Sequence, residues 1–165
     1  MKKLHLFILT FLLSALFSCN GTDNESLSAD DRKAIDETFQ KAWSDLNNGD
    51  WSSYINLYGE DAVIMPPYHK KYYGTKGIRQ YLTDKGLDPD IIKKPNLIFK
   101  FKLVEAWGSP DEARIVGDFS YVLPNGKVFS EGKSFAELKK DKEGNWKVTH
   151  SMWNCNQIPP WFTEK

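Results

Sequence analysis

The residues best suited to acid-base chemistry lie near the end of the chain, around His150. The segment from Trp146 to Asn154 has the alternating character of a strand, and alternation places His150 on the same face as Met152 and Asn154. The ordinary pKa of histidine lies close to neutral pH, so His150 is the best candidate for a general base or a ligand-orienting group. A histidine among aromatic residues is also often a structural core residue, and the sequence leaves both interpretations open.

A catalytic partner for His150 cannot be placed from the sequence. Glu105 shares the predicted strand face of Trp107 and is the better candidate for a buried carboxylate, although the end of a strand can equally be solvated. Arg114 and Asp118 share a polar strand face, where we expect an exposed ion pair. A mechanism that needs a carboxylate base together with converging hydrogen-bond donors therefore lacks its carboxylate here.

Metal and cofactor chemistry are not indicated by the residue spacing. His69 and His150 are far apart in the sequence, Cys155 has no nearby cysteine, and no group of His, Cys and Asp has the spacing of zinc ligands. The sequence also has no nucleophile-elbow motif for a Ser-His-Asp triad. We therefore expect no metal and no cofactor.

The start of the chain predicts export and lipid anchoring. Lys2-Lys3 and an apolar run precede Leu16-Phe17-Ser18-Cys19, which resembles the lipobox of bacterial lipoproteins. The resemblance implies a signal peptide over residues 1–18, acylation of Cys19, and a lipid-anchored protein of the bacterial cell envelope. The apolar run is shorter than the ~20 residues of a bilayer-spanning helix, so a retained transmembrane anchor is the weaker alternative. The other alternative is an ordinary secreted protein in which Cys19 has no role as an anchor.

Composition points to one domain without a nucleic-acid partner. Removal of the leader takes two lysines from 22 basic residues and nothing from 22 acidic residues, which leaves a net charge of −2. The remaining lysines and arginines are dispersed rather than gathered in a stripe, so no nucleic acid is expected as a partner. Residues 19–29 read as a flexible tether, 30–158 as one domain and 159–165 as a tail.

Three helices are expected in the first half of the domain. Ser28 can cap a helix whose apolar face includes Trp43, and Asp50 can cap a shorter helix that runs through Tyr58 to Gly59. Thr75 can cap a third helix, which ends at Lys85-Gly86. Between the second and third helices, residues 62–65 predict a short strand ended by two prolines.

From Pro95 onward the pattern changes to the two-residue period of strands. Turns at Pro124-Asn125-Gly126 and Glu143-Gly144-Asn145 separate the later strands as hairpins. Helices followed by an antiparallel meander predict an α+β fold, in which the three N-terminal helices pack on one face of a strongly bent antiparallel sheet.

Several short motifs, in their order and spacing, support this architecture. Asn48-Gly49-Asp50, Asp61-Ala62-Val63, Met65-Pro66-Pro67 and Gly74-Thr75-Lys76-Gly77-Ile78, together with the Trp146-to-Asn154 strand, resemble the nuclear transport factor 2-like superfamily, specifically its SnoaL-like branch. The resemblance implies a cone-like curved antiparallel sheet with the three helices on its concave face, an apolar cavity, and commonly a homodimer through the outer face of the sheet. It does not imply an activity, because the fold hosts several unrelated chemistries and members with none.

We therefore expect a pocket lined by aromatic residues, which the side chains can also fill completely. The predicted pocket residues are Trp43, Tyr54, Tyr58, Met65, Tyr72, Phe101, Trp107, Phe119, Tyr121, His150 and Asn154. Three functions remain open: binding of a small, mostly apolar molecule; an isomerase, dehydratase or hydrolase reaction with His150 as the base; and a dimeric interaction module without a ligand. A closed cavity under ~300 Å³ favours the module.

Overall fold

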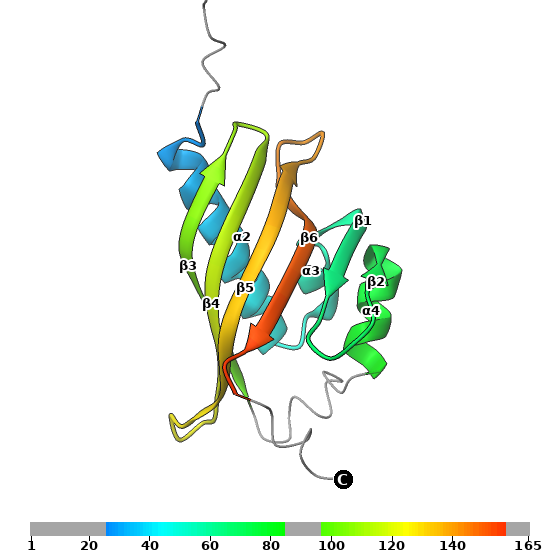
Figure 1. Cartoon of the computed structure of the whole chain (residues 1–165), viewed down its shortest axis with the longest axis vertical. Coiled ribbons are helices and arrows are strands. Elements are labelled where there is room, and N and C mark those ends of the chain that lie inside the picture. The colour runs from blue at the N-terminus through cyan, green and yellow to red at the C-terminus, as the bar shows by residue number, and fades with distance from the viewer. Residues whose placement is uncertain (1–25, 85–96, 158–165) are drawn as a thin grey trace, which may run out of the picture.

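The computed structural model describes residues 26–84 and 97–157. The predicted leader, Cys19, most of the tether and the tail over 159–165 lie outside the described residues. The described chain contains helices α2 (Ala29–Asn47), α3 (Trp51–Ile55) and α4 (Gly74–Asp84). These helices cover one face of a six-stranded sheet (Figure 1), which confirms the predicted α+β fold. None of the described helices is long and apolar enough to cross a membrane.

The sheet is mixed, with one parallel pair. Its strands are β1 (Tyr58–Met65), β2 (Tyr72–Tyr73), β3 (Ile98–Gly108), β4 (Glu112–Val122), β5 (Val128–Lys140) and β6 (Trp146–Cys155). They are arranged in the order β2-β1-β6-β5-β4-β3. The last four strands form the predicted antiparallel meander, whereas β1 runs parallel to β6. A parallel neighbour is possible because the greater part of the domain separates β1 from β6 in sequence.

Two of the three predicted helix caps are present, at Ser28 and Asp50, whereas Thr75 lies inside α4, which begins at Gly74. The Ser28 side chain accepts a hydrogen bond from the Asp31 backbone N–H at 3.0 Å, and Asp50 accepts one from the Ser53 N–H at 3.0 Å. The second helix is shorter than expected, because it ends at Ile55 and Tyr58 already belongs to β1. Pairing with the last strand explains this end, since the Val148 N–H donates to the Leu57 carbonyl at 2.9 Å.

Both predicted hairpin turns are formed around glycines in the left-handed region. Gly126 has φ +84° and Gly144 has φ +83°, values that L-residues with a side chain rarely adopt. The turns fix the register of β4 with β5 and of β5 with β6.

The register is interrupted in four of the strand pairs, and the interruptions in β3–β4 and β5–β6 affect the predicted site residues. In the β3–β4 pairing, Leu103 pairs with Gly117 and Glu105 with Val116, so Val104 is an extra residue. In the β5–β6 pairing, His150 pairs with Glu137 and Val148 with Leu138, so Thr149 is an extra residue. Each β-bulge shifts the following side chains by one position relative to a regular strand. The residues that face the helices therefore change identity beyond each bulge.

Candidate functional site

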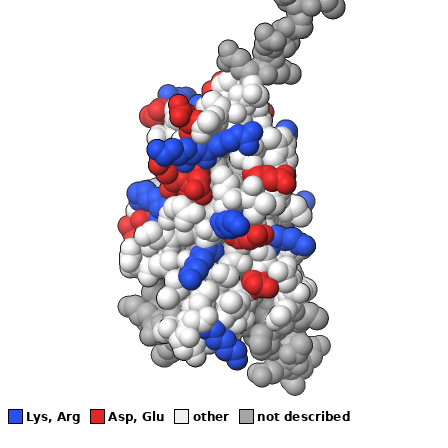
Figure 2. Space-filling view, turned by 90° about the vertical axis from the view of Figure 1, so that its left-hand side faces the viewer, with Lys and Arg blue, Asp and Glu red and all other residues white. Residues whose placement is uncertain are grey.

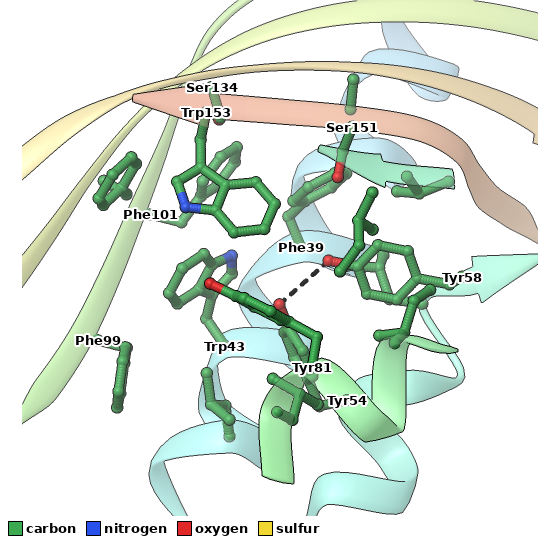
Figure 3. A pocket seen from close by; sticks show the side chains of 18 of the residues that line it. Phe39, Trp43, Tyr54, Tyr58, Tyr81, Phe99, Phe101, Ser134, Ser151 and Trp153 are labelled. Atoms are coloured by element: carbon green, nitrogen blue, oxygen red, sulfur yellow. Dashed lines mark hydrogen bonds between the residues drawn. The ribbon is translucent and has the colours of Figure 1, made fainter. Parts of the chain in front are cut away.

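The concave side of the sheet and the three helices enclose an apolar cavity of about 70 Å³. Helix α2 packs against β3, with the Phe39 and Phe101 rings stacked at a centroid distance of 4.7 Å. Figure 3 shows the side chains of the cavity converging from the helices and from β3 and β6. The principal lining residues are Phe39, Trp43, Leu46, Tyr54, Tyr58, Ile64, Tyr81, Phe99, Phe101, Phe119, Tyr121, Ser134, Ala136, Val148, Ser151 and Trp153.

The structure brings about half of the predicted pocket residues together. The predicted residues that line the cavity are Trp43, Tyr54, Tyr58, Phe101, Phe119 and Tyr121. Tyr72 is buried behind this layer, with its ring 5.2 Å from the ring of Tyr81, which itself lines the cavity. Met65 is half-buried and does not line the cavity; it pairs with Met152 at the β1–β6 junction.

The prediction that His150 faces into the cone is wrong. Thr149 is the extra residue of the β6 bulge, so the regular alternation that starts at Val148 is displaced by one position. His150, Met152 and Asn154 therefore point to the outer face of the sheet, the face turned away from the helices, and all three are exposed. The His150 side chain is 51% exposed.

The Val104 bulge has the same effect on β3. Beyond the bulge Ala106 is buried, whereas Glu105 and Trp107 are exposed. Trp107 is 39% exposed, and its ring lies against Phe135 at a centroid distance of 6.3 Å, away from the cavity. The expectation that Trp107 lines the pocket is therefore wrong, and of the two alternatives left open for Glu105 the structure shows the solvated one.

His150 belongs instead to a polar cluster on the outer face. Its Nδ1 atom lies 3.6 Å from a carboxylate oxygen of Glu137, and the other carboxylate oxygen accepts a hydrogen bond from Arg114 Nε at 3.2 Å. Arg114 is exposed as expected, but its ion-pair partner is Glu137 on the neighbouring strand rather than Asp118. Asp118 lies between Lys102 and Lys133 in the strand register.

Most of the lining residues are absent from the predicted pocket, among them Ser151, Trp153 and Tyr81. Regular alternation along residues 146–154 places Ser151 and Trp153 on the face opposite to that of His150, and the β6 bulge reverses this placement. The alternation of Ser151 and Trp153 was visible, but the choice between the two strand faces depended on the bulge. No motif in the sequence indicates that bulge.

Three of the hydroxyl groups that line the cavity lie close to one another, those of Tyr54, Tyr58 and Ser151. The hydroxyl groups of Tyr54 and Tyr58 form a hydrogen bond of 3.1 Å, drawn as a dashed line in Figure 3. Ser151 Oγ is buried and makes no hydrogen bond of normal geometry with the described residues, although it lies close enough to the Tyr58 hydroxyl to offset part of the rise in the Tyr58 pKa. The hydroxyl of the other lining serine, Ser134, donates to the Gly117 carbonyl at 3.2 Å.

The phenol groups of the cavity stay protonated at neutral pH. Burial away from water raises the pKa of Tyr54 and Tyr58, and it also raises the pKa of Tyr81 and Tyr121. None of the lining residues is charged or is a histidine. The cavity can therefore offer neutral hydroxyl groups for hydrogen bonding, but its walls offer no carboxylate, imidazole or amine as a base.

No metal centre emerges from the described part of the chain. In residues 26–84 and 97–157 there is no group of three or more His, Cys, Asp or Glu side chains positioned to hold a metal ion.

No protein-family model and no curated protein matches this sequence. Solved structures do match its fold. An NTF-2 like protein of unknown function from Shewanella oneidensis MR-1 is 18% identical with a TM-score of 0.60, over 74% of this chain and 97% of that one. A ketosteroid isomerase-like protein from Erwinia carotovora atroseptica is 14% identical with a TM-score of 0.62, over 79% and 100% of the two chains.

A protein from Catenulispora acidiphila, solved in complex with S-DNPA, is 10% identical with a TM-score of 0.62, over 78% of this chain and 96% of that one. At these identities the likeness establishes the fold alone. The chain has the nuclear transport factor 2-like fold, as the sequence motifs implied.

Proposed function

We propose that this domain binds a small, uncharged, mostly apolar molecule in its aromatic cavity. The observation that carries the proposal is the lining itself, which is aromatic and aliphatic with a few hydroxyl groups and no charged side chain. Ligand sites are concave, mostly apolar and equipped with a small number of placed polar groups. The complex of S-DNPA with the Catenulispora acidiphila protein supports the idea that this fold accommodates small molecules.

The cavity volume limits the size of the ligand. About 70 Å³ is roughly half of the ~150 Å³ cavity that accommodates benzene in an engineered protein. A ring-sized ligand therefore requires small displacements of the aromatic walls, for which half-buried Trp153 is the best placed side chain. An isomerase-type reaction is the less well supported function, because a proton-abstracting group is missing from the lining.

A filling variant tests the proposal directly. Ala136 lines the cavity and is 3% exposed, so Ala136→Val adds two methyl groups into the empty space. We expect 4-fluorophenol, followed by ¹⁹F NMR, to bind the wild-type domain and to bind Ala136→Val at least about tenfold more weakly. Ala113→Val is the matched control, because Ala113 is equally buried but does not line the cavity. Equal loss in both variants, or no binding to the wild type, contradicts the proposal.

A specific observation favours a second candidate, a self-associating interaction module. The cavity is smaller than the ~300 Å³ that ligand pockets typically have. On the outer face, Val104, Trp107 and Met152 are 47%, 39% and 50% exposed. Such a cluster of exposed apolar side chains is typical of an interface. We propose a second copy of this chain as the occupant of that face, and the two functions are compatible.

We further propose that the domain is tethered to a membrane of the bacterial envelope through acylated Cys19. The support is the sequence Leu16-Phe17-Ser18-Cys19 and the short distance in sequence from Cys19 to the first described helix at Ala29. Acyl chains contribute about 0.8 kcal/mol per buried methylene, so more than one chain gives stable anchoring. Cys19→Ser is expected to move the protein from the membrane fraction to the soluble fraction. A processed variant that still sediments with membranes would contradict the tether.

A further inference from the structure

We propose that the cavity has a polar end, formed by Ser151 and the Tyr54–Tyr58 hydroxyl pair, that recognises one neutral oxygen atom of the ligand. The ligand class is then an apolar ring or chain that carries a single hydroxyl or carbonyl group. This inference rests on the proposed binding function and specifies what the cavity binds. It starts from the Ser151 hydroxyl.

The Ser151 hydroxyl is a buried group that lacks its hydrogen bond. The residue is 8% exposed, and its Oγ atom has no partner among the described residues. Buried polar side-chain atoms in folded proteins are nearly always hydrogen-bonded, so an exception in a cavity wall calls for a partner from outside the chain. Ser134 in the same cavity shows the ordinary situation, because its hydroxyl is satisfied by the Gly117 carbonyl.

The neighbouring tyrosines add a second free hydroxyl proton. Tyr54 and Tyr58 share one hydrogen bond of 3.1 Å, in which either hydroxyl can be the donor. One of the two phenol protons is used in that bond, and the other remains available. Together with the Ser151 proton, the polar end can direct two donors to one oxygen. Figure 3 shows the three hydroxyl oxygens following one another along the same side of the cavity.

The surroundings select a neutral oxygen over a charged one. The lining contains no lysine, arginine or histidine that could compensate a carboxylate or phosphate. Moving an ion out of water into such a site is strongly unfavourable without a partner charge. A carbonyl or hydroxyl oxygen has a far smaller desolvation cost and can accept both protons.

The rest of the cavity fits an apolar body. The rings of Phe39 and Trp43 are both stacked with the ring of Phe101, at centroid distances of 4.7 Å and 6.1 Å. The rings leave space that a flat or short aliphatic group can enter after small shifts. The predicted ligand is therefore oriented, with its oxygen toward Ser151 and its carbon skeleton toward the phenylalanines.

The test compares two probes of nearly equal shape, 4-fluorophenol and 4-fluorotoluene, by ¹⁹F NMR titration of the domain near pH 7. They differ only in a hydroxyl against a methyl group. We expect the wild type to prefer 4-fluorophenol by about tenfold, the size of one net hydrogen bond. Ser151→Ala should reduce that preference to about twofold or less, whereas the matched variant Ser130→Ala, at a buried serine that does not line the cavity, should retain it. The charged probe 4-fluorobenzoate should bind at least about tenfold more weakly than 4-fluorophenol.

The outcomes separate this inference from the function on which it rests. If both probes bind the wild type equally well, the cavity binds apolar molecules, but the proposal that its polar end recognises an oxygen atom is contradicted. If Ser151→Ala keeps the full preference, the assignment of Ser151 is wrong. If neither probe binds and the Ala136→Val and wild-type spectra agree, the binding function itself fails. Tyr58→Phe is the second variant, expected to weaken the preference while the thermal unfolding midpoint shows that the domain remains folded.

Discussion

At the scale of single residues, the position of His150 separates a binding cavity from an acid-base site. The imidazole lies on the outer face beside Glu137, and the bulge residue Thr149 donates its hydroxyl to the Glu137 carbonyl at 3.2 Å. This hydrogen bond helps to hold the extra residue Thr149 in place. Because of the bulge, His150 lies on the outer face of the sheet, whereas Val148 faces the helices. A general base must come within hydrogen-bond reach of the substrate, which the outer face does not allow for a cavity ligand.

His150→Gln is therefore expected to leave 4-fluorophenol affinity within about twofold of wild type. The side chains of His150 and Glu137 are 51% and 40% exposed, so loss of their contact should change the free energy of unfolding by less than about 1 kcal/mol. The ¹⁹F titration and a urea unfolding curve measure the two quantities. A large loss of 4-fluorophenol binding in the folded variant would contradict this prediction and show that His150 contributes to the binding site.

Asp31 provides a pH-dependent contribution at the first turn of α2. A hydrogen bond from Lys140 and one from Ser28 lower the pKa of Asp31 from its ordinary value of 3.8. Because the pKa is lower in the folded state, the carboxylate adds stability above the ordinary pKa and loses this effect as the pH falls through the folded value. The Lys140 Nζ atom lies 2.8 Å from the carboxylate, at the surface.

We expect Asp31→Asn to be less stable than wild type near pH 7, with a difference that disappears at a pH well below 3.8. Urea unfolding curves of the two proteins near pH 7 and in acid measure this difference in the free energy of unfolding. Lys140→Gln is the matched variant, and Asp31→Asn should cost less in that background. A difference that is unchanged in acid would show that the ion pair is not its source.

At the scale of elements, α2 covers the free edge of β3. The Asn47 side chain donates to the Phe99 carbonyl at 2.9 Å and accepts from the Phe99 N–H at 2.8 Å. Gln40 donates to the Phe101 carbonyl at 3.1 Å, and Arg32 donates to the Ala106 carbonyl. Figure 2 views the side of the molecule at the left of Figure 1, where α2 and β3 lie, and shows both signs of charge interspersed there. An edge occupied in this way is a poor template for another strand.

Asn47→Ala is expected to destabilise the domain by about 1–3 kcal/mol, because it leaves both backbone groups of Phe99 without their partner. Asn47→Asp should lose less, since a carboxylate still accepts from the Phe99 N–H. Asn48→Ala is a suitable control, because Asn48 is exposed and its side chain makes no hydrogen bond to the edge. Equal unfolding free energies for the two alanine variants would contradict the edge role.

The same elements explain what the sequence could and could not predict. Caps at Ser28 and Asp50 and glycines at 126 and 144 act locally, so the helix starts and the hairpin turns followed from nearby residues. The faces of β3 and β6 did not follow, because one extra residue reverses the assignment of every residue beyond it. Near Val104 both Ala106 and Trp107 are apolar, so the hydrophobic pattern fits either face.

At the scale of the whole molecule, the sheet has two faces with different roles. The helices cover the concave face and create the cavity, whereas the outer face is left uncovered by any described helix (Figure 1). On the outer face, Trp107 and Phe135 form an aromatic contact, and exposed Val104 and Met152 extend the apolar surface. Charged residues of both signs border this surface, including Arg114, so a second copy would meet no uniform repulsion.

We therefore predict a homodimer through the outer face in sedimentation experiments at tens of micromolar protein. Met152→Lys should shift the population to monomer, with a dimer dissociation constant raised at least about tenfold, because a charge would be buried in an apolar contact. Val128→Lys is the control: Val128 is 48% exposed but lies at the hairpin end of the sheet, next to Val122. Because the cavity lies on the opposite face of the sheet, both variants should retain 4-fluorophenol binding. A wild-type domain that remains monomeric throughout this concentration range would overturn the interface and leave the binding function standing.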